Sequence, residues 1–287
     1  MAVSPRLAGA HGDRTHAHNP LAELLALGRP LIMGILNVTP DSFSDGGRFL
    51  DPSGALDHAR RMIAEGADIL DIGAESTRPY GGAVPVPLEE EIRRLTPVLP
   101  QAVALRVPVS IDTMKAKVAD WAIAAGAAII NDVWGLQREE AMARVATRWG
   151  VPVIVMHNRE HADPSLDIIA EIAEFFARSL EIAANAGLPR QQIVLDPGIG
   201  FGKTPEQSMI AIARLRELKS FGLPILVGAS RKRFIARISP ASPDHRLGGS
   251  LAAHLAAVAN GAAIIRTHDV AETAQALRVA AAIEAVQ

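Results

Sequence analysis

The sequence predicts a single (β/α)8 barrel, the TIM-barrel fold, preceded by a short N-terminal extension. From residue 31 onward, eight short apolar runs alternate with eight longer stretches of helical spacing. Eight such βα units in about 255 residues match the barrel in both number and size. An open, doubly wound sheet is the second interpretation, because such a sheet usually has fewer strands and a switch point in strand order.

The expected strands are apolar throughout and show little alternation with polar residues. That pattern is typical of strands that are buried on both faces, as in a parallel sheet covered by helices. The runs span residues 31–37, 68–73, 108–112, 128–132, 152–157, 193–196, 224–230 and 263–269.

The stretches between the strands carry signals for both helix ends. Many begin after Asp, Ser, Thr or Pro, which favour helix N-termini. Several end at a glycine that suits a C-cap, namely Gly66, Gly126, Gly150, Gly187 and Gly261. The expected helical stretches are 52–66, 88–105, 115–126, 138–150, 166–187, 205–222, 245–261 and 270–287.

Composition and the N-terminal segment narrow the class of protein. A net charge of −2 argues against a nucleic-acid or membrane-surface role. The absence of cysteine excludes disulfides and thiolate chemistry. Residues 1–28 form the predicted flexible extension, with a short helix near 20–27, and residues 29–287 form the barrel. The extension lacks an apolar core of the kind found in secretory signals, and no window of 18 apolar residues occurs. We expect a cytoplasmic protein.

The segment DPGIGFGKT, residues 196–204, looks like a nucleotide-phosphate loop but does not fit one. A P-loop needs a glycine six places before its lysine, and Pro197 holds that place before Lys203. The dinucleotide fingerprint also fails, because the third glycine comes one residue early. What remains is an apolar strand that ends in Asp196 and a glycine-rich loop.

Polar side chains follow every expected strand, at the end where a barrel carries its active site. Acceptors and amides among them suit an uncharged planar ring that is rich in hydrogen-bond donors. The cations suit phosphates and carboxylates. The pattern therefore predicts a substrate with a heteroaromatic ring at one end and an anion at the other. The strand-end residues are Asn37, Asp71, Glu75, Thr77, Arg78, Asp112, Asn131, Asp132, His157, Asp196, Ser230, Arg231, Lys232, Arg266 and His268.

Seven segments, in order along the chain, resemble the dihydropteroate synthase family of the folate pathway. The resemblance covers about residues 31 to 285 and implies a transferase reaction. In that reaction the amine of 4-aminobenzoate displaces diphosphate from (7,8-dihydropterin-6-yl)methyl diphosphate and gives 7,8-dihydropteroate. The segments are GILNVTPDSFSDGG (34–47), DIGAESTRP (71–79), SIDT (110–113), IND (130–132), LDPGIGFGK (195–203), GASRK (228–232) and RTHDV (266–270).

The resemblance also implies roles for individual residues. Asp112, Asn131 and Asp196 would hold the pterin, and Asn37 would bind Mg²⁺ through its amide oxygen. The implied catalytic residues are Asp45, Arg78 and Lys232. The remaining implied contacts of the pterin diphosphate are Thr77, Lys232, Arg266, Thr267 and His268. Those of 4-aminobenzoate are Phe43, Thr77, Pro79, Phe201, Ser230 and Lys232.

The resemblance further implies that two loops move and that the reaction follows a dissociative mechanism. The loop at 38–49 and the STRP loop would close over the substrates, while Mg²⁺ and the cationic cluster stabilise the departing diphosphate. Asp45 and the acidic residues that bind the ring would help to stabilise a cationic pterin methylene, which the aniline nitrogen then attacks. The resemblance further suggests a homodimer.

Three positions depart from the usual family pattern, and two other functions remain open. Tyr80 stands where a glycine usually follows STRP, Arg233 where a small residue is frequent, and residues 157–165 differ in their loop. A pterin-binding methyltransferase domain would share the barrel but needs no diphosphate site. A catalytically idle paralogue that keeps the fold as a binding protein is the alternative from a different class.

Overall fold

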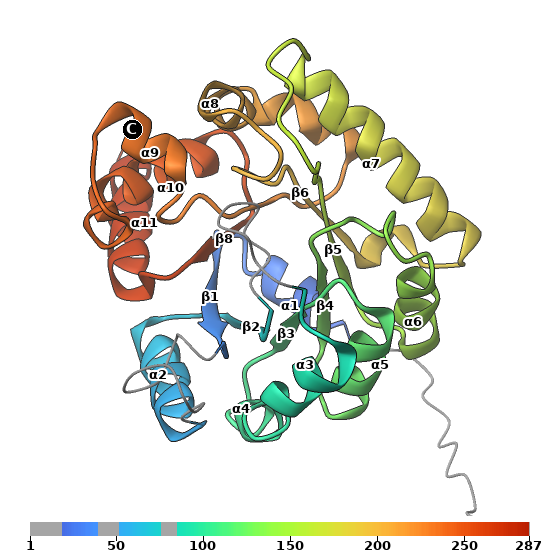
Figure 1. Ribbon diagram of the computed structural model, residues 1–287. Helices are drawn as coiled ribbons and strands as arrows, with labels where there is room; N and C mark the ends of the chain where they lie inside the picture. Colours follow the sequence, from blue (N-terminus) through green and yellow to red (C-terminus); the bar gives the residue numbers. More distant parts are fainter. Residues whose placement is uncertain (1–18, 40–51, 76–84, 287) are drawn as a thin grey trace, which may run out of the picture.

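The computed structural model describes residues 19–39, 52–75 and 85–286, and over these residues it confirms the predicted barrel (Figure 1). Within them, eight parallel strands form one sheet that curves into a barrel, and helices surround it. The strands are β1 (Leu31–Asn37), β2 (Ile69–Gly73), β3 (Val109–Asp112), β4 (Ile129–Asp132), β5 (Val153–Met156), β6 (Ile193–Asp196), β7 (Leu226–Val227) and β8 (Ile264–Thr267).

The order of the strands in the sheet is β6-β5-β4-β3-β2-β1-β8-β7. β6 and β7 meet across a seam, where the described residues include one isolated bridge, between Leu195 and Ile225. The Leu195 N–H also donates to the Pro224 carbonyl at 2.9 Å. β7 is shorter than the predicted run at 224–230, because the chain leaves the sheet after Val227 and turns at Arg231, where φ is +58°. The barrel is therefore nearly closed, and its weakest joint lies at this seam.

Helices form the outer layer, as Figure 1 shows around the strands. The predicted helix at 88–105 is divided in two, because Pro100 lacks the N–H that a continuous helix would bond to Thr96. The predicted helix at 205–222 continues as a 3₁₀ turn over its second half, and α9 was not predicted. The helices are α2 (Pro52–Glu65), α3 (Leu88–Leu95), α4 (Leu99–Val103), α5 (Ala116–Ala124), α6 (Ala141–Trp149), α7 (Ile168–Asn185), α8 (Pro205–Ala213), α9 (Arg233–Ile238), α10 (Leu247–Ala259) and α11 (Val270–Glu284), with 3₁₀ turns η1 (Arg190–Gln192), η2 (Leu215–Phe221) and η3 (Pro243–His245).

The predicted helix-end signals have a clear structural basis. Thr204 caps α8 with a capping box, in which its hydroxyl accepts from the Gln207 N–H at 3.1 Å and Gln207 accepts from the Thr204 N–H at 3.0 Å. Gly150 ends α6 in the left-handed conformation, with φ of +66°. The start of α8 and the end of α6 are thus fixed locally.

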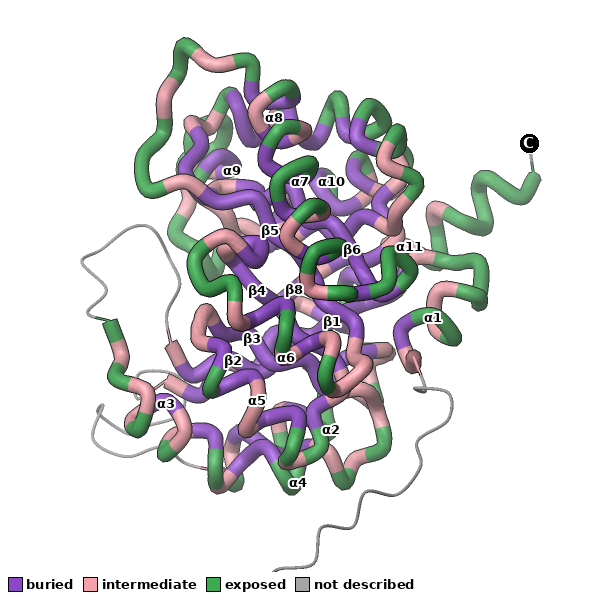
Figure 2. The backbone as a smooth tube through the Cα atoms, turned by 90° about the vertical axis from the view of Figure 1, so that its right-hand side faces the viewer, coloured by how far each residue is buried: buried purple, intermediate pink, exposed green. Residues whose placement is uncertain are grey.

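Two apolar clusters divide the core. The larger one lies between the strands and the helices, and most of the strand backbone is buried (Figure 2). The smaller one fills the barrel interior. The short helix α1 (Pro20–Leu25), predicted within the extension, closes the amino-terminal end of the barrel, and its Leu21 is only 2% exposed. The interior cluster consists of Leu21, Leu31, Met33, Ile69, Ile129, Ile154, Val194, Leu226 and Ile264.

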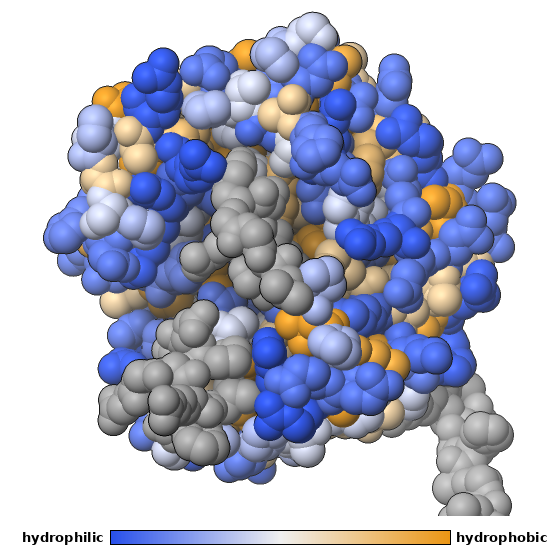
Figure 3. Space-filling view, in the orientation of Figure 1, coloured by the Kyte–Doolittle hydropathy of each residue, from blue (hydrophilic) through white to orange (hydrophobic). Residues whose placement is uncertain are grey.

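The face that Figure 3 shows is mostly hydrophilic, with apolar residues scattered among polar ones. Among the described residues, no helix is both long enough and apolar enough to span a membrane.

Candidate active site

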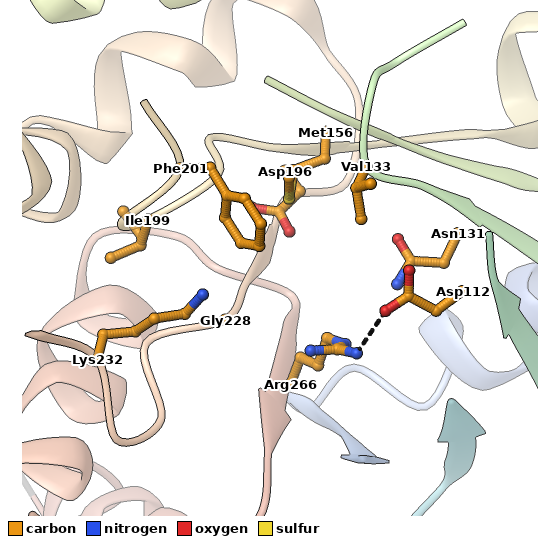
Figure 4. Close-up of a pocket in the computed structure, with 10 residues that line it drawn as sticks. All are labelled: Asp112, Asn131, Val133, Met156, Asp196, Ile199, Phe201, Gly228, Lys232 and Arg266. Atoms are coloured by element: carbon orange, nitrogen blue, oxygen red, sulfur yellow. Dashed lines mark hydrogen bonds and ion pairs between the residues drawn. The ribbon is translucent and has the colours of Figure 1, made fainter. Parts of the chain in front are cut away.

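A pocket lies at the carboxyl ends of the strands and gathers side chains from distant parts of the chain (Figure 4). One wall is polar and comes from β3, β4, β6 and β8. The other wall contains apolar side chains and the lysine that precedes α9. The lining residues are Asp112, Asn131, Val133, Met156, Asp196, Ile199, Phe201, Gly228, Lys232 and Arg266.

The two acidic members of the wall are almost completely buried. Burial raises the pKa of Asp196 to about 6, although the Gly198 N–H that donates to its Oδ1 at 2.7 Å opposes the shift. Burial also raises the pKa of Asp112, against the attraction of Arg266. Above neutral pH the pocket thus holds two buried carboxylates, which gain from any hydrogen-bond donor that a ligand brings.

Arg266 lies within this acidic group. Its Nε donates to Asp71 Oδ2 at 2.6 Å, and its Nη2 donates to Asp112 Oδ2 at 2.9 Å, the contact drawn in Figure 4. The resemblance implied that Arg266 binds diphosphate, and the structure places it in the polar wall beside Asp112. Asp71 belongs to this group as well, yet the sequence analysis assigned it no role.

The spacing of the interior residues contained the signal that identifies Asp71. Side chains on one strand alternate between two faces, so residues two apart lie on the same side. Ile69 belongs to the interior cluster, and Asp71 follows it by two residues on β2. The period of two along the strand therefore predicts that Asp71 faces inward, but it does not predict the hydrogen-bond partners of Asp71.

Lys232 and Phe201 form the opposite wall. The Lys232 ammonium lies 4.1 Å from the centre of the Phe201 ring, within the range of a cation–π contact. In Figure 4 this ammonium points towards the centre of the pocket. The structure therefore brings together the predicted ring readers Asp112, Asn131 and Asp196 with Phe201 and Lys232.

The glycine-rich loop after β6 is not arranged as a phosphate-binding loop. Lys203 is buried beneath the loop, where its Nζ donates to the carbonyls of Gly198 at 3.0 Å and Phe201 at 3.1 Å. It also contacts His157 Nδ1 at 2.5 Å. Burial lowers the pKa of Lys203, and burial together with Lys203 lowers the pKa of His157 to about 2. This lysine thus holds the loop that carries Asp196 and Phe201, and it does not face a phosphate.

Ser230 and His268 lie together beside the pocket. The Ser230 hydroxyl is 3.0 Å from His268 Nδ1, and the His268 N–H donates to the same hydroxyl at 3.3 Å. Burial lowers the pKa of His268 to about 3, and Arg266 acts in the same direction. In the ligand-free protein this shift favours the uncharged imidazole near neutral pH, so His268 would meet an anion as a hydrogen-bond donor.

Two further residues lie apart from the pocket lining. Thr267 turns its hydroxyl to Thr273 of α11 at 3.2 Å, because it occupies the outward-facing position between Arg266 and His268. Its side chain is therefore directed away from the proposed diphosphate site. Asn37 ends β1 in a half-buried position at the same level as Gly73 of β2.

Several predicted site residues lie outside the described part of the chain. These are Phe43, Asp45, Thr77, Arg78 and Pro79, together with the departure at Tyr80.

A polar pocket at the carboxyl ends of the strands is where TIM-barrel enzymes carry their active sites, so the fold and this pocket define the chain as a TIM barrel of the enzyme type. Residues 33–268 match the family described as pterin binding enzyme. The dihydropteroate synthase of Bacillus subtilis is 44% identical over 248 residues, covering 86% of each chain. That of Escherichia coli is 44% identical over 263 residues, covering 89% of this chain and 92% of the other.

Solved structures agree with these relatives. The Clostridium difficile dihydropteroate synthase in the presence of pteroic acid has a TM-score of 0.85 at 46% identity, over 89% of this chain and 97% of that one. The Xanthomonas albilineans enzyme in complex with 7,8-dihydropteroate has a TM-score of 0.83 at 42% identity, over 91% and 96%. The chain belongs to the pterin-binding enzymes and, within them, to the dihydropteroate synthases, which are transferases.

Replacing Gly198 with alanine is expected to disrupt the loop. Gly198 has φ of +64°, and a Cβ there would lie 1.9 Å from the His157 carbonyl oxygen. Gly222→Ala is a matched control, because its φ is +65° and nothing lies within 4 Å of its Cβ. Both variants bear a left-handed strain of about 1–2 kcal/mol. Only Gly198→Ala should also lose pterin binding, which calorimetry can measure. Equal effects of the two substitutions would contradict this account.

Asp196→Asn is expected to stabilise the ligand-free protein at alkaline pH. Folding raises the pKa of Asp196 from 3.8 to about 6, so its contribution to stability is present below about pH 4 and lost as the pH rises through 6. Near pH 8 the buried carboxylate costs about 2–3 kcal/mol. The amide keeps an oxygen for the Gly198 N–H. Thermal unfolding should show the variant more stable at pH 8 and the difference shrinking towards pH 4.5. A difference that does not change with pH would exclude this explanation.

Proposed function

We propose that the protein condenses 4-aminobenzoate with (7,8-dihydropterin-6-yl)methyl diphosphate, giving 7,8-dihydropteroate and diphosphate. The observation that carries this proposal is the convergence of Asp112, Asn131 and Asp196 on one pocket with Lys232 and Arg266. Structures of relatives described with 4-aminobenzoic acid and with 7,8-dihydropteroate support the choice of substrates.

The pocket suits a pterin for reasons of polarity and shape. A pterin presents a ring N–H beside an exocyclic amine, and a carboxylate accepts two such parallel hydrogen bonds. Asp196 is buried and offers that carboxylate at the end of β6. Val133, Met156 and Ile199 provide apolar surface for the faces of the ring. A bound ring is therefore transferred from water into a buried site whose hydrogen-bonding groups are already in position.

The chemistry needs no nucleophile from the protein. The carbon–oxygen bond to diphosphate breaks, and the pair of electrons leaves with the diphosphate. Positive charge then develops on the pterin methylene, where the ionised forms of Asp112 and Asp196 stabilise it electrostatically. The amine of 4-aminobenzoate attacks this carbon and loses a proton to the surroundings. We assign Lys232, which contacts Phe201, the role of orienting the second substrate. The roles proposed for Asp45 and Arg78 fall outside the described residues.

Mg²⁺ remains a proposal, with Asn37 as its protein ligand. The described residues contain no group of three His, Cys, Asp or Glu side chains that would hold a metal. An amide oxygen at the barrel mouth suits Mg²⁺, which prefers a few hard oxygen ligands together with water and substrate phosphates. When bound, the ion would neutralise charge on the departing diphosphate. We expect its affinity to depend on diphosphate, because the described part of the chain contributes only this one proposed ligand.

The quaternary structure and location are also proposals. α11 exposes the apolar residues Val279 and Ile283, each more than half accessible, beside the alanine-rich α10. This surface and the family resemblance support a homodimer. The lack of a spanning helix in the described residues is compatible with a place in the cytoplasm.

Purified protein is expected to release diphosphate only when both substrates are present, and the gene should rescue a strain that cannot make dihydropteroate. Diphosphate release in the two-substrate assay separates this activity from its rivals. A methyltransferase would consume a methyl donor and release no diphosphate, and an idle paralogue would bind the pterin without turnover. Either result would overturn the proposal.

Asn37→Ala is expected to raise the Mg²⁺ concentration for half-maximal activity by about tenfold, as the loss of about 1.4 kcal/mol from one ligand implies. Binding of 6-hydroxymethylpterin, which has no diphosphate, should be unchanged. Titrating both quantities in the variant and the wild type provides the check. An unchanged Mg²⁺ requirement would remove Asn37 from the metal site.

A further inference from the structure

Asp71 is a fully buried carboxylate that connects two pocket residues. It is 0% exposed, and its Oδ2 accepts hydrogen bonds from Arg266 Nε at 2.6 Å and from Asn131 Nδ2 at 3.1 Å. These partners come from β8 and β4, while Asp71 itself lies on β2. Asp71 is absent from the pocket lining. Any effect on a ligand must therefore pass through its partners.

The first consequence concerns the direction of the Asn131 amide. An amide has an acceptor end and a donor end, whereas an ionised carboxylate only accepts. Reversing the amide would place two oxygens about 3.1 Å apart in a buried site, with no proton between them. Asp71 therefore fixes the Nδ2 of Asn131 on its own side. Figure 4 shows the result, with the amide oxygen turned towards Asp196 and the nitrogen towards Arg266.

The second consequence concerns Asp112. Arg266 is shared between Asp71 and Asp112, so it neutralises neither carboxylate alone. Arg266 contacts Oδ2 of Asp112, while Oδ1 has no hydrogen-bond partner among the described residues. Without the charge on Asp71, Arg266 would lie wholly with Asp112 and compete with a ligand for that carboxylate. Asp71 thus keeps a second acceptor available.

We propose that Asp71 is a positioning residue that sets the hydrogen-bonding polarity of the pterin pocket. By orienting Asn131 and sharing Arg266, it makes Asn131, Asp112 and Asp196 present acceptors together. The pocket then favours rings that present hydrogen-bond donors to these three residues. It disfavours rings that present an acceptor at the same position. This inference rests on the proposed function, because it concerns how the same site recognises its ring.

A purely structural role for Asp71 makes a different prediction. If Asp71 only neutralises Arg266, its loss lowers stability and weakens all ring ligands alike. If Asp71 sets polarity, its loss changes the preference between ligands. The informative quantity is therefore the affinity ratio of two rings of the same shape, one with a hydrogen-bond donor and the other with an acceptor at position 2. Suitable probes are 6-hydroxymethylpterin and 6-hydroxymethyl-lumazine, in which an oxygen replaces the 2-amino group.

Calorimetry with Asp71→Asn tests the inference at pH 8. The variant keeps the side-chain size but permits Asn131 to reverse, so the preference for pterin over lumazine should fall by about tenfold or more, since one mismatched buried hydrogen bond costs about 1–3 kcal/mol. Asp68→Asn is the matched control. Asp68 pairs with Arg29 at 2.7 Å and directly precedes β2, on the amino-terminal side of Asp71. Its loss should leave the ratio unchanged.

The double variant Asp71→Asn/Asn131→Asp provides the rescue. It exchanges donor and acceptor across the same contact and preserves the number of buried charges. The pocket again meets an acceptor at position 131, so the ratio should return to within about threefold of the wild type. If the single variant does not fold, the double variant alone decides, because a lost preference there overturns the inference.

The outcomes separate this inference from the proposed function. A wild type that binds neither ring refutes the proposed function. A wild type that prefers pterin, with an Asp71→Asn variant of the same ratio, refutes the role of Asp71 alone. Equal weakening of both rings without rescue in the double variant assigns Asp71 a structural role and also refutes the inference.

Discussion

The alternation of side chains along each strand is the constraint that places the polar wall of the pocket. Inward-facing residues on β2, β4, β6 and β8 first fill the barrel interior with apolar side chains. Two residues further on, the same four strands carry inward-facing polar side chains. The polar side chains of the pocket therefore lie directly next to the apolar side chains that fill the barrel interior. The apolar residues are Ile69, Ile129, Val194 and Ile264, and the polar ones are Asp71, Asn131, Asp196 and Arg266.

This arrangement keeps charged groups in a place that water reaches poorly, which carries a cost in stability. The raised pKa values of Asp112 and Asp196 express that cost, since burial disfavours their ionised forms. Arg266 offsets part of it, and the same low polarity strengthens any contact with a ligand. The buried charges of the pocket thus lower the stability of the fold, while the same burial strengthens their contacts with a ligand.

The barrel and most of the pocket were predictable from the sequence, because periodicity and polar strand ends are local properties. Asp112, Asn131, Asp196 and Lys232 follow from those signals together with the family resemblance. The contact between Asp71 and Arg266 was not predictable, since it joins residues 195 positions apart through the geometry of the closed sheet. The buried position of Lys203 was equally hidden, because its glycine-rich surroundings resemble a loop that faces a ligand.

The seam between β6 and β7 lies beside this pocket. Asp196 ends one of the two strands, and Lys232 follows the other by a few residues. A ligand that contacts both spans the joint where the barrel has fewest backbone bonds. By mass action, a ligand bound across the seam stabilises the closed arrangement of β6 and β7 relative to any form in which the two strands separate.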